Sequence, residues 1–227
     1  MKNLKILVAC TVFLAVLAVA AKAQMGMGMG MRPQPMPHGV FNPVVGFGAQ
    51  YEVDRAGKKT VTEYTVVGKE TVNGKNGYWL EYTSSGTPMG DVVMKMLLVL
   101  DGGRTATTRT IMQMGTRPPM EMSSQMGQMS AQQDQPADIH TESEVVGKES
   151  ITTPAGTFLC EHLRAKDGSS DTWISDKVSP LGIVKRQGKD SSMLLTKVIT
   201  GAKDKIVGTP VPFNPMQMMQ GMQPPTQ

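Results

Sequence analysis

The residues best suited to covalent chemistry in this sequence are a cysteine and three histidines. Cys160, Glu161 and His162 are consecutive, which places a nucleophile near a base. In a strand, however, residues i and i+2 share a face only as neighbours, and neither an orienting third group nor an oxyanion loop accompanies them. His38 falls in a Pro- and Gly-rich tract, and His140 lies at the edge of a linker. Motifs of hydrolases, zinc proteases and phosphate loops are absent, so we predict a non-enzymatic protein with no catalytic residue and no cofactor.

Cysteine usage predicts a buried thiol. Of the two cysteines, Cys10 falls in the leader described below, which leaves Cys160 without a partner for an internal disulfide. Cys160 lies among Phe158, Leu159 and Leu163 in a strand-like run. We therefore expect this thiol to be part of the core rather than reactive.

Methionine supplies a second kind of chemistry. The chain has 20 methionines, many of them spaced as Met-x-Met in its terminal tracts and in residues 120–129. Thioether sulfurs prefer soft ions such as Cu(I). Met120, Met122, Met126 and Met129 are the candidate metal ligands, and flexible low-complexity filler is the alternative interpretation.

An apolar run at residues 92–100 indicates either a core strand or the wall of a ligand cavity. Met94, Met96 and Leu98 would share one strand face, while the other face is apolar as well, so both faces need cover. Methionine adapts to varied apolar partners. The candidate ligand-binding residues are Trp79, Met94, Met96, Leu98, Phe158 and Trp173.

The elements that must position these residues are β-strands. Alternating apolar positions, β-branched residues and Gly- or Pro-containing turns predict a series of short strands. The predicted strands are residues 49–55, 59–67, 70–73, 77–83, 92–100, 104–114, 142–146, 149–152, 157–166, 171–175, 182–187 and 193–200. This spacing predicts a mainly β protein, with a curved antiparallel sheet or an unclosed β-barrel. Residues 119–133 are predicted as either a short helix laid over the concave face, because their methionines recur at i, i+4 and i+7, or a loop.

Two segments of the chain resemble each other. Residues 63–80 and 142–159 are identical at 8 of 18 aligned positions, and both contain Val-Val-Gly-Lys-Glu. Gly68 and Gly147 would each supply a bulge or a positive-φ corner. Trp79 with Leu80, and Phe158 with Leu159, would anchor the returning strands in the core. This similarity between residues 63–80 and 142–159, here called the echo, predicts two similar strand–hairpin units. A true duplication whose two halves line one pocket is the alternative.

The composition of the ends predicts export. Two lysines precede an apolar run that ends in Ala21-Lys22-Ala23, which is typical of a secretory signal peptide over residues 1–23. Without it, 20 basic residues face 19 acidic ones and the formal charge falls from +4 to +1. A nucleic-acid partner is therefore not expected, nor is a transmembrane span. We expect a periplasmic or secreted protein that begins near Gln24, and its oligomeric state stays open.

The sequence predicts one folded domain between low-complexity margins. Residues 24–47 and 207–227 are rich in Met, Pro, Gly and Gln and are predicted to be disordered tails. The domain spans residues 48–206 and carries a Met- and Gln-rich insertion at 115–138.

Three motifs in the second half carry a family resemblance. Thr153–Cys160 (Thr-Pro-Ala-Gly-Thr-Phe-Leu-Cys), Asp171–Ser175 and Val178–Lys185 resemble exported β-proteins similar to the periplasmic lipoprotein-carrier superfamily. This resemblance implies a curved antiparallel sheet around an apolar cavity closed by helices. The long amphipathic N-terminal helix of such carriers has no counterpart in this sequence.

These observations together predict an exported, non-enzymatic protein that binds an apolar ligand, such as a lipid, an acyl chain or a lipidated segment, in a concave sheet face. The alternatives are a methionine-rich Cu(I)-binding protein and a structural or interaction protein of the cell envelope with no small ligand.

Overall fold

The computed structural model describes residues 37–87, 90–122 and 135–213, and most of these residues are in β-strands. The strands are β1 (Phe47–Arg55), β2 (Lys58–Val72), β3 (Lys75–Thr87), β4 (Gly90–Asp101), β5 (Arg104–Met114), β6 (Met120–Glu121), β7 (Gln135–Pro136), β8 (Ser143–Thr153), β9 (Gly156–Ala165), β10 (Ser170–Ile174), β11 (Ile183–Gly188), β12 (Ser191–Thr200) and β13 (Val211–Pro212). The short 3-10 helix η1 (Ile139–Glu142) precedes β8. The predicted mainly β class is confirmed.

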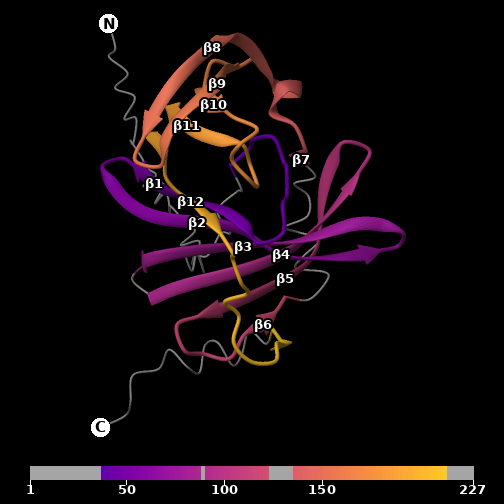
Figure 1. The fold of residues 1–227 in the computed structure, drawn as a ribbon. Coiled ribbons are helices and arrows are strands. Elements are labelled where there is room, and N and C mark those ends of the chain that lie inside the picture. The colour runs from indigo at the N-terminus through magenta and orange to yellow at the C-terminus, as the bar shows by residue number, and fades with distance from the viewer. Residues whose placement is uncertain (1–36, 88–89, 123–134, 214–227) are drawn as a thin grey trace, which may run out of the picture. The chain divides into compact units, whose positions relative to one another are not determined.

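The strands form one open sheet made of two meanders. Its order is β13-β6-β5-β4-β3-β2-β1-β12-β11-β10-β9-β8, and β7 pairs with β5. The meanders join where β12 pairs antiparallel with β1, from Phe47 opposite Thr200 to Arg55 opposite Ser191. Figure 1 shows β8 to β11 curving over one end of the sheet and β3 to β6 at the other. Because β8 and β13 do not pair with each other, the sheet does not close, as predicted.

Two predicted interruptions of the strands are bulges instead. We predicted separate strands on either side of Gly68 and of Gly147, but β2 and β8 run through both positions. Val66 pairs with Leu80 and Gly68 with Trp79, so Val67 is the extra residue of a β-bulge. The register of β8 shifts in the same way between Val145 and Gly147. Of the two alternatives predicted for Gly68 and Gly147, a bulge and a positive-φ corner, the structure has the bulge in both copies. A bulge bends a strand without ending its pairing, so the strands continue through both positions.

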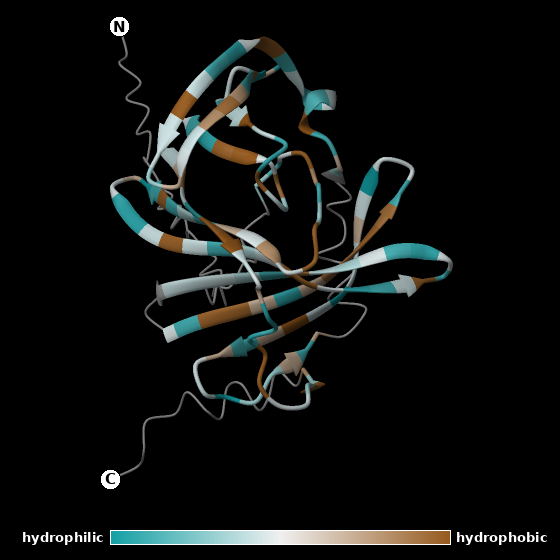
Figure 2. Ribbon diagram, in the orientation of Figure 1, coloured by the Kyte–Doolittle hydropathy of each residue, from teal (hydrophilic) through white to brown (hydrophobic). Residues whose placement is uncertain are grey.

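The two faces of the sheet carry different clusters. We call the inner face the one that carries Tyr51, Leu80 and Leu195, all fully buried in the main core. The outer face carries Trp79, Leu97 and Ile111, which form a second cluster. Since successive residues of a strand point to opposite faces, apolar and polar residues alternate along much of the ribbon in Figure 2.

The folded part begins earlier and ends later than predicted. Residues 37–46 were assigned to a tail, yet Val40 donates a backbone hydrogen bond to Leu181, and Phe41 packs against the main core. At the other end β13 pairs in parallel with β6. Low-complexity composition misplaced both boundaries, because partners distant in sequence supply the hydrogen bonds.

The insertion at 115–138 contains a short strand near each end, β6 and β7. Met120 pairs with Met112, and β7 pairs with β5 near Arg104. The prediction of a helix that starts at residue 119 is therefore wrong, because Met120 and Glu121 pair with the edge of β5 instead. The rest of that prediction, residues 123–133, lies outside the described residues.

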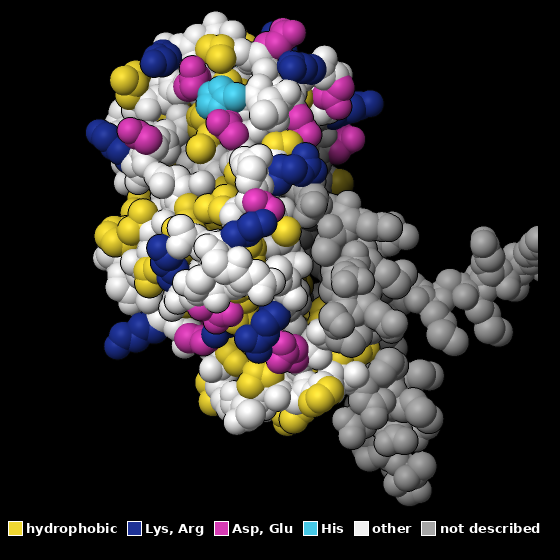
Figure 3. Space-filling view, turned by 90° about the vertical axis from the view of Figure 1, so that its right-hand side faces the viewer, with side chains coloured by type: hydrophobic (Ala, Val, Ile, Leu, Met, Phe, Trp, Pro, Cys, Tyr) yellow, Lys and Arg dark blue, Asp and Glu magenta, His cyan; other side chains and the backbone are white. Residues whose placement is uncertain are grey.

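Across the described residues, no helix has the length and hydrophobicity needed to span a membrane. The face shown in Figure 3 carries acidic and basic side chains interspersed with apolar ones. That mixture agrees with the nearly balanced charge predicted for the chain without its leader.

Candidate functional site

The main core of the inner face brings together four of the six predicted ligand-binding residues. Leu98 on β4 is buried in the main core, and Met96 packs against this core from the same strand. Phe158 on β9 and Trp173 on β10 reach the same core from the second meander and stay partly buried. The structure therefore joins residues from both halves of the chain around one apolar centre.

The other two predicted residues lie elsewhere. Trp79 is on the outer face, 9% exposed, and belongs to the second cluster with Leu97 and Ile111. Met94 is on the inner face, where it lies between Tyr82 and Met112 on the neighbouring strands and is half-buried. Since Trp79 and Leu80 are consecutive in one strand, only one of them could point to the inner face.

A ladder of tyrosines extends the inner-face core toward Met94. The rings of Tyr51 and Tyr64 lie 6.1 Å apart edge to face, and Tyr64 and Tyr82 lie 5.2 Å apart. The Tyr51 hydroxyl donates a hydrogen bond of 3.0 Å to the Ile183 carbonyl. Burial raises the pKa of Tyr51 far above its usual range, so this ring acts as a neutral core side chain.

Both tryptophans are held by the echoed glutamates. The Trp79 indole donates to Glu70 at 3.0 Å, and the Trp173 indole donates to Glu149 at 2.6 Å. Glu70 and Glu149 occupy the same place in the two copies of Val-Val-Gly-Lys-Glu. A lysine also lies over each ring, Lys95 over Trp79 at 4.7 Å and Lys185 over Trp173 at 4.5 Å. Each of these glutamates therefore fixes the orientation of an aromatic side chain.

The core anchors of the echo do not match as predicted. Leu80 is fully buried, whereas Leu159 is 67% exposed. The second hairpin is two residues longer on each arm between bulge and turn, so Leu163, not Leu159, lies opposite the residue before the bulge. Leu163 is 1% exposed, which makes it the structural counterpart of Leu80.

Residues 201–208, which follow β12, cross the outer face and form a strap. Figure 1 shows this strap as the yellow segment running across β3, β4 and β5 toward β6. Its backbone exchanges hydrogen bonds with the Gln113 side chain at Val207, 2.9 Å from the N–H and 3.2 Å from the carbonyl. Lys95 forms an ion pair with Asp204, and Ile206 packs against the cluster of Trp79.

Beneath the strap lies a buried carboxyl group, Glu81 on β3. It is 0% exposed. One carboxyl oxygen accepts the Lys205 backbone N–H at 2.9 Å, and the other has no hydrogen-bond partner. Burial, with a smaller contribution from the nearby Asp204 carboxylate, raises the pKa of Glu81 to about 7. This carboxyl group therefore changes charge near neutral pH.

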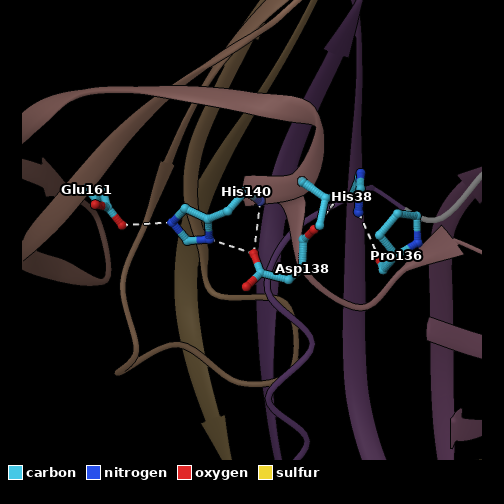
Figure 4. A network of polar contacts seen from close by, with 6 residues as sticks. His38, Pro136, Asp138, His140 and Glu161 are labelled. Atoms are coloured by element: carbon cyan, nitrogen blue, oxygen red, sulfur yellow. Dashed lines mark hydrogen bonds and ion pairs between the residues drawn. The ribbon is translucent and has the colours of Figure 1, made fainter. Parts of the chain in front are cut away.

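The histidines lie in networks with carboxylates around the second meander. His140 on η1 lies between Asp138, which caps this helix, and Glu161 on β9, whose oxygen is 2.9 Å from the imidazole (Figure 4). Burial disfavours the charged ring, but the bonds to Glu161 and Asp138 outweigh it and raise the pKa of His140. His38 contacts the Pro136 carbonyl at 2.9 Å. These contacts fasten the N-terminal segment and η1 to the sheet.

The Cys160–His162 pair has no catalytic geometry in the structure. The Cys160 sulfur contacts the Phe158 carbonyl at 3.5 Å, while His162 contacts Asp171 at 2.7 Å and stacks on Trp173. Cys160 is 1% exposed, and burial raises the pKa of its thiol to about 11. The predicted burial of this thiol is confirmed.

In a Cys10→Ser chain, we expect Cys160 to react with a disulfide reagent about a hundredfold more slowly in the folded than in the unfolded protein at pH 8, because its thiolate is scarce and enclosed. Absorbance of the released thiolate measures the rate. The same protein in guanidinium provides the reference, and equally fast labelling of the folded protein would show that the thiol is accessible.

The predicted metal ligands are only partly described. Met120 and Met122 lie on β6 and directly after it, both half-buried, whereas Met126 and Met129 lie outside the described residues. Within ranges 37–87, 90–122 and 135–213, no group of three or more His, Cys, Asp or Glu side chains could hold a metal ion.

Several residues of these sites were not predicted from the sequence. Glu81 alternates with apolar residues as a solvent-facing residue would, and nothing in the sequence indicates the strap that covers it. Tyr82 and Met112 could have been found only from strand register, which pairs them with Met94.

Comparisons with known proteins identify no family for this chain. No family model matches the chain, and no curated protein does. A candidate exported protein with a YmcC-like fold from Bacteroides fragilis is similar at 15% identity with a TM-score of 0.40, covering 71% of this chain and 99% of that one. A candidate lipoprotein from Parabacteroides distasonis is similar at 15% identity with a TM-score of 0.37, covering 72% of this chain and 100% of that one.

Proposed function

We propose that this chain is an exported, non-enzymatic protein that binds an apolar ligand, an acyl chain or a lipidated segment, against the inner face of its sheet. Export is inferred from the predicted signal peptide at residues 1–23. The observation that carries the binding proposal is the rim of the main core. Large side chains from both meanders are only partly buried there: Tyr78, Tyr82, Met96, Phe158 and Trp173.

The chemistry of this rim favours an apolar ligand. Its members are aromatic rings and a thioether, which offer large apolar area and adapt to varied shapes. The polar atoms of Trp173 are already engaged, because its indole donates to Glu149. An acyl chain would gain about 0.8 kcal/mol for each methylene it buries against such a surface.

The test is lipid capture by the chain without residues 1–23. The purified protein is incubated with a lipid extract of a bacterial envelope, re-purified, and the retained lipid is quantified by mass spectrometry. We expect a stoichiometric lipid in the wild type and about a tenfold weaker retention in Phe158→Ser, because one aromatic anchor is lost.

Leu159→Ser is the matched control. Leu159 is the next residue of the same strand, points to the opposite face and is already exposed, so its loss should leave retention unchanged. Repeated recovery of an empty wild-type protein, or equal loss in both variants, would refute the proposal.

A further inference from the structure

Strand register aligns three methionines on the inner face of the first meander. Met94 on β4 pairs directly with Met112 on β5, and Met112 pairs directly with Met120 on β6. Directly paired residues point to the same face of a sheet, with neighbouring strands about 4.8 Å apart. The three side chains, here called the methionine row, therefore lie side by side across three strands.

Three more methionines, Met96, Met114 and Met122, lie beside the row on the same face. Met96 lies two residues beyond Met94 and pairs with Thr110, whose carbonyl accepts the Met122 backbone N–H at 2.9 Å. Met96 and Met122 thus lie on the same face as the row, two residues along the chain from Met94 and Met120. Met114 lies two residues beyond Met112 on β5 and is 4% exposed. Six thioethers therefore lie on one face, as three pairs of residues spaced i, i+2 along neighbouring segments of the chain.

The charges near this place are on the opposite face. Lys95 and Glu121 alternate with the methionines and point to the outer face, as does Arg109, which is paired with Glu121 there. On the inner face the row is flanked by Tyr82 and Thr110. Such a surface offers neutral, soft donors to an ion and no carboxylate or imidazole from these strands.

The row is also open at its ends. Met112 is 8% exposed at the centre, whereas Met94 and Met120 on either side are half-buried. An ion could reach the outer two thioethers from solvent and contact the buried one. Long unbranched side chains allow the sulfurs of neighbouring strands to approach one another.

We propose that Met94, Met112 and Met120 form a site for a single Cu(I) ion, held by thioether sulfurs alone. Neutral sulfur donors select soft monovalent copper over harder divalent ions, which need imidazole or carboxylate ligands. The site is independent of the apolar ligand proposed above, whose test uses Phe158. It also differs from the terminal Met-x-Met tracts, because it depends on pairing between strands rather than on local sequence.

The experiment measures Cu(I) affinity of the chain without residues 1–23, by anaerobic competition with a chromophoric Cu(I) chelator. The triple variant Met94→Leu, Met112→Leu, Met120→Leu keeps the apolar volume and removes the sulfurs. We expect it to bind the tightest copper equivalent at least about tenfold more weakly. X-ray absorption of the wild-type complex should show only sulfur ligands.

Two controls separate the row from other methionines. Met218→Leu, Met219→Leu, Met222→Leu removes three thioethers near the C-terminus, and Met193→Leu removes one from the main core. Both should keep the tightest copper equivalent. If the row variant binds as the wild type does, or if the C-terminal variant loses the same equivalent, the proposal is wrong. Should the triple variant fail to fold, Met94→Leu alone must lower the number of sulfurs seen by X-ray absorption.

Discussion

Replacing Glu81 by glutamine is expected to stabilise the protein by about 2 kcal/mol at pH 8 and to change its stability little at pH 4. The carboxyl group is fully buried, and one of its oxygens has no hydrogen-bond partner. Its charged neighbours are Lys95 on the paired strand and Asp204 and Lys205 on the strap. Glutamine keeps the acceptor for the Lys205 N–H and is neutral at every pH.

The direction of this change in stability follows from the raised pKa of Glu81. The folded state holds its proton up to about pH 7, whereas the unfolded chain releases it near the ordinary value of 4.5. The contribution of Glu81 to stability is complete below the unfolded value and is lost as the pH rises through the folded value. Urea denaturation at pH 4, 6 and 8 measures this loss in the wild type and its absence in Glu81→Gln.

Glu63→Gln is the matched control. Burial raises the pKa of Glu63, but hydrogen bonds from Lys205 and Gln50 outweigh it and lower this pKa below its usual value. Its contribution is therefore present at neutral pH and lost as the pH falls, opposite in sign to that of Glu81. Parallel pH profiles for the wild type and Glu81→Gln would mean that water reaches this carboxyl group.

Leu80→Ala is expected to lower the free energy of unfolding by about 3 kcal/mol, and Leu159→Ala by less than about 0.5 kcal/mol. Leu80 is fully buried in the main core between Val66 and Met96 on the paired strands, so truncation leaves a cavity. Leu159 occupies the same position of the sequence echo but is 67% exposed. Chemical denaturation of both variants measures the difference.

Leu163→Ala extends this comparison. Leu163 lies opposite the residue before the second bulge and is buried, so we expect it to resemble Leu80 and not Leu159. Similar losses for Leu80→Ala and Leu159→Ala would show that the sequence alignment of the two segments is also their structural alignment.

Local pattern was sufficient for most of the strands. The runs at residues 49–55, 92–100, 104–114 and 193–200 each lie within a strand of the structure, because alternation, β-branched residues and Gly-containing turns act over a few residues. The two Val-Val-Gly sequences left a bulge and a positive-φ corner open, and the structure has a bulge in both β2 and β8.

The sites were less accessible to prediction, because they depend on pairing between strands. Met94 was a candidate from its own strand, but its partners Met112 and Tyr82 come from the register of β5 and β3. Trp79 was assigned to a common apolar site with Leu98. The alternation of β3, in which the neighbouring Leu80 points to the inner face, places it on the outer face instead.

The mainly β class, most strand positions and the burial of Cys160 could be predicted from the sequence, since these follow from short-range pattern and turn chemistry. Three features could be seen only in the folded protein. Strand β12 pairs with β1, and residues 37–46 and the strap cover the sheet. Glu81 is buried, whereas Leu159 is exposed. Each of these depends on contacts between residues more than a hundred positions apart or on a two-residue difference in hairpin length. Composition and periodicity do not predict such pairings, because the segment that covers a surface and the surface itself need not share any local sequence pattern.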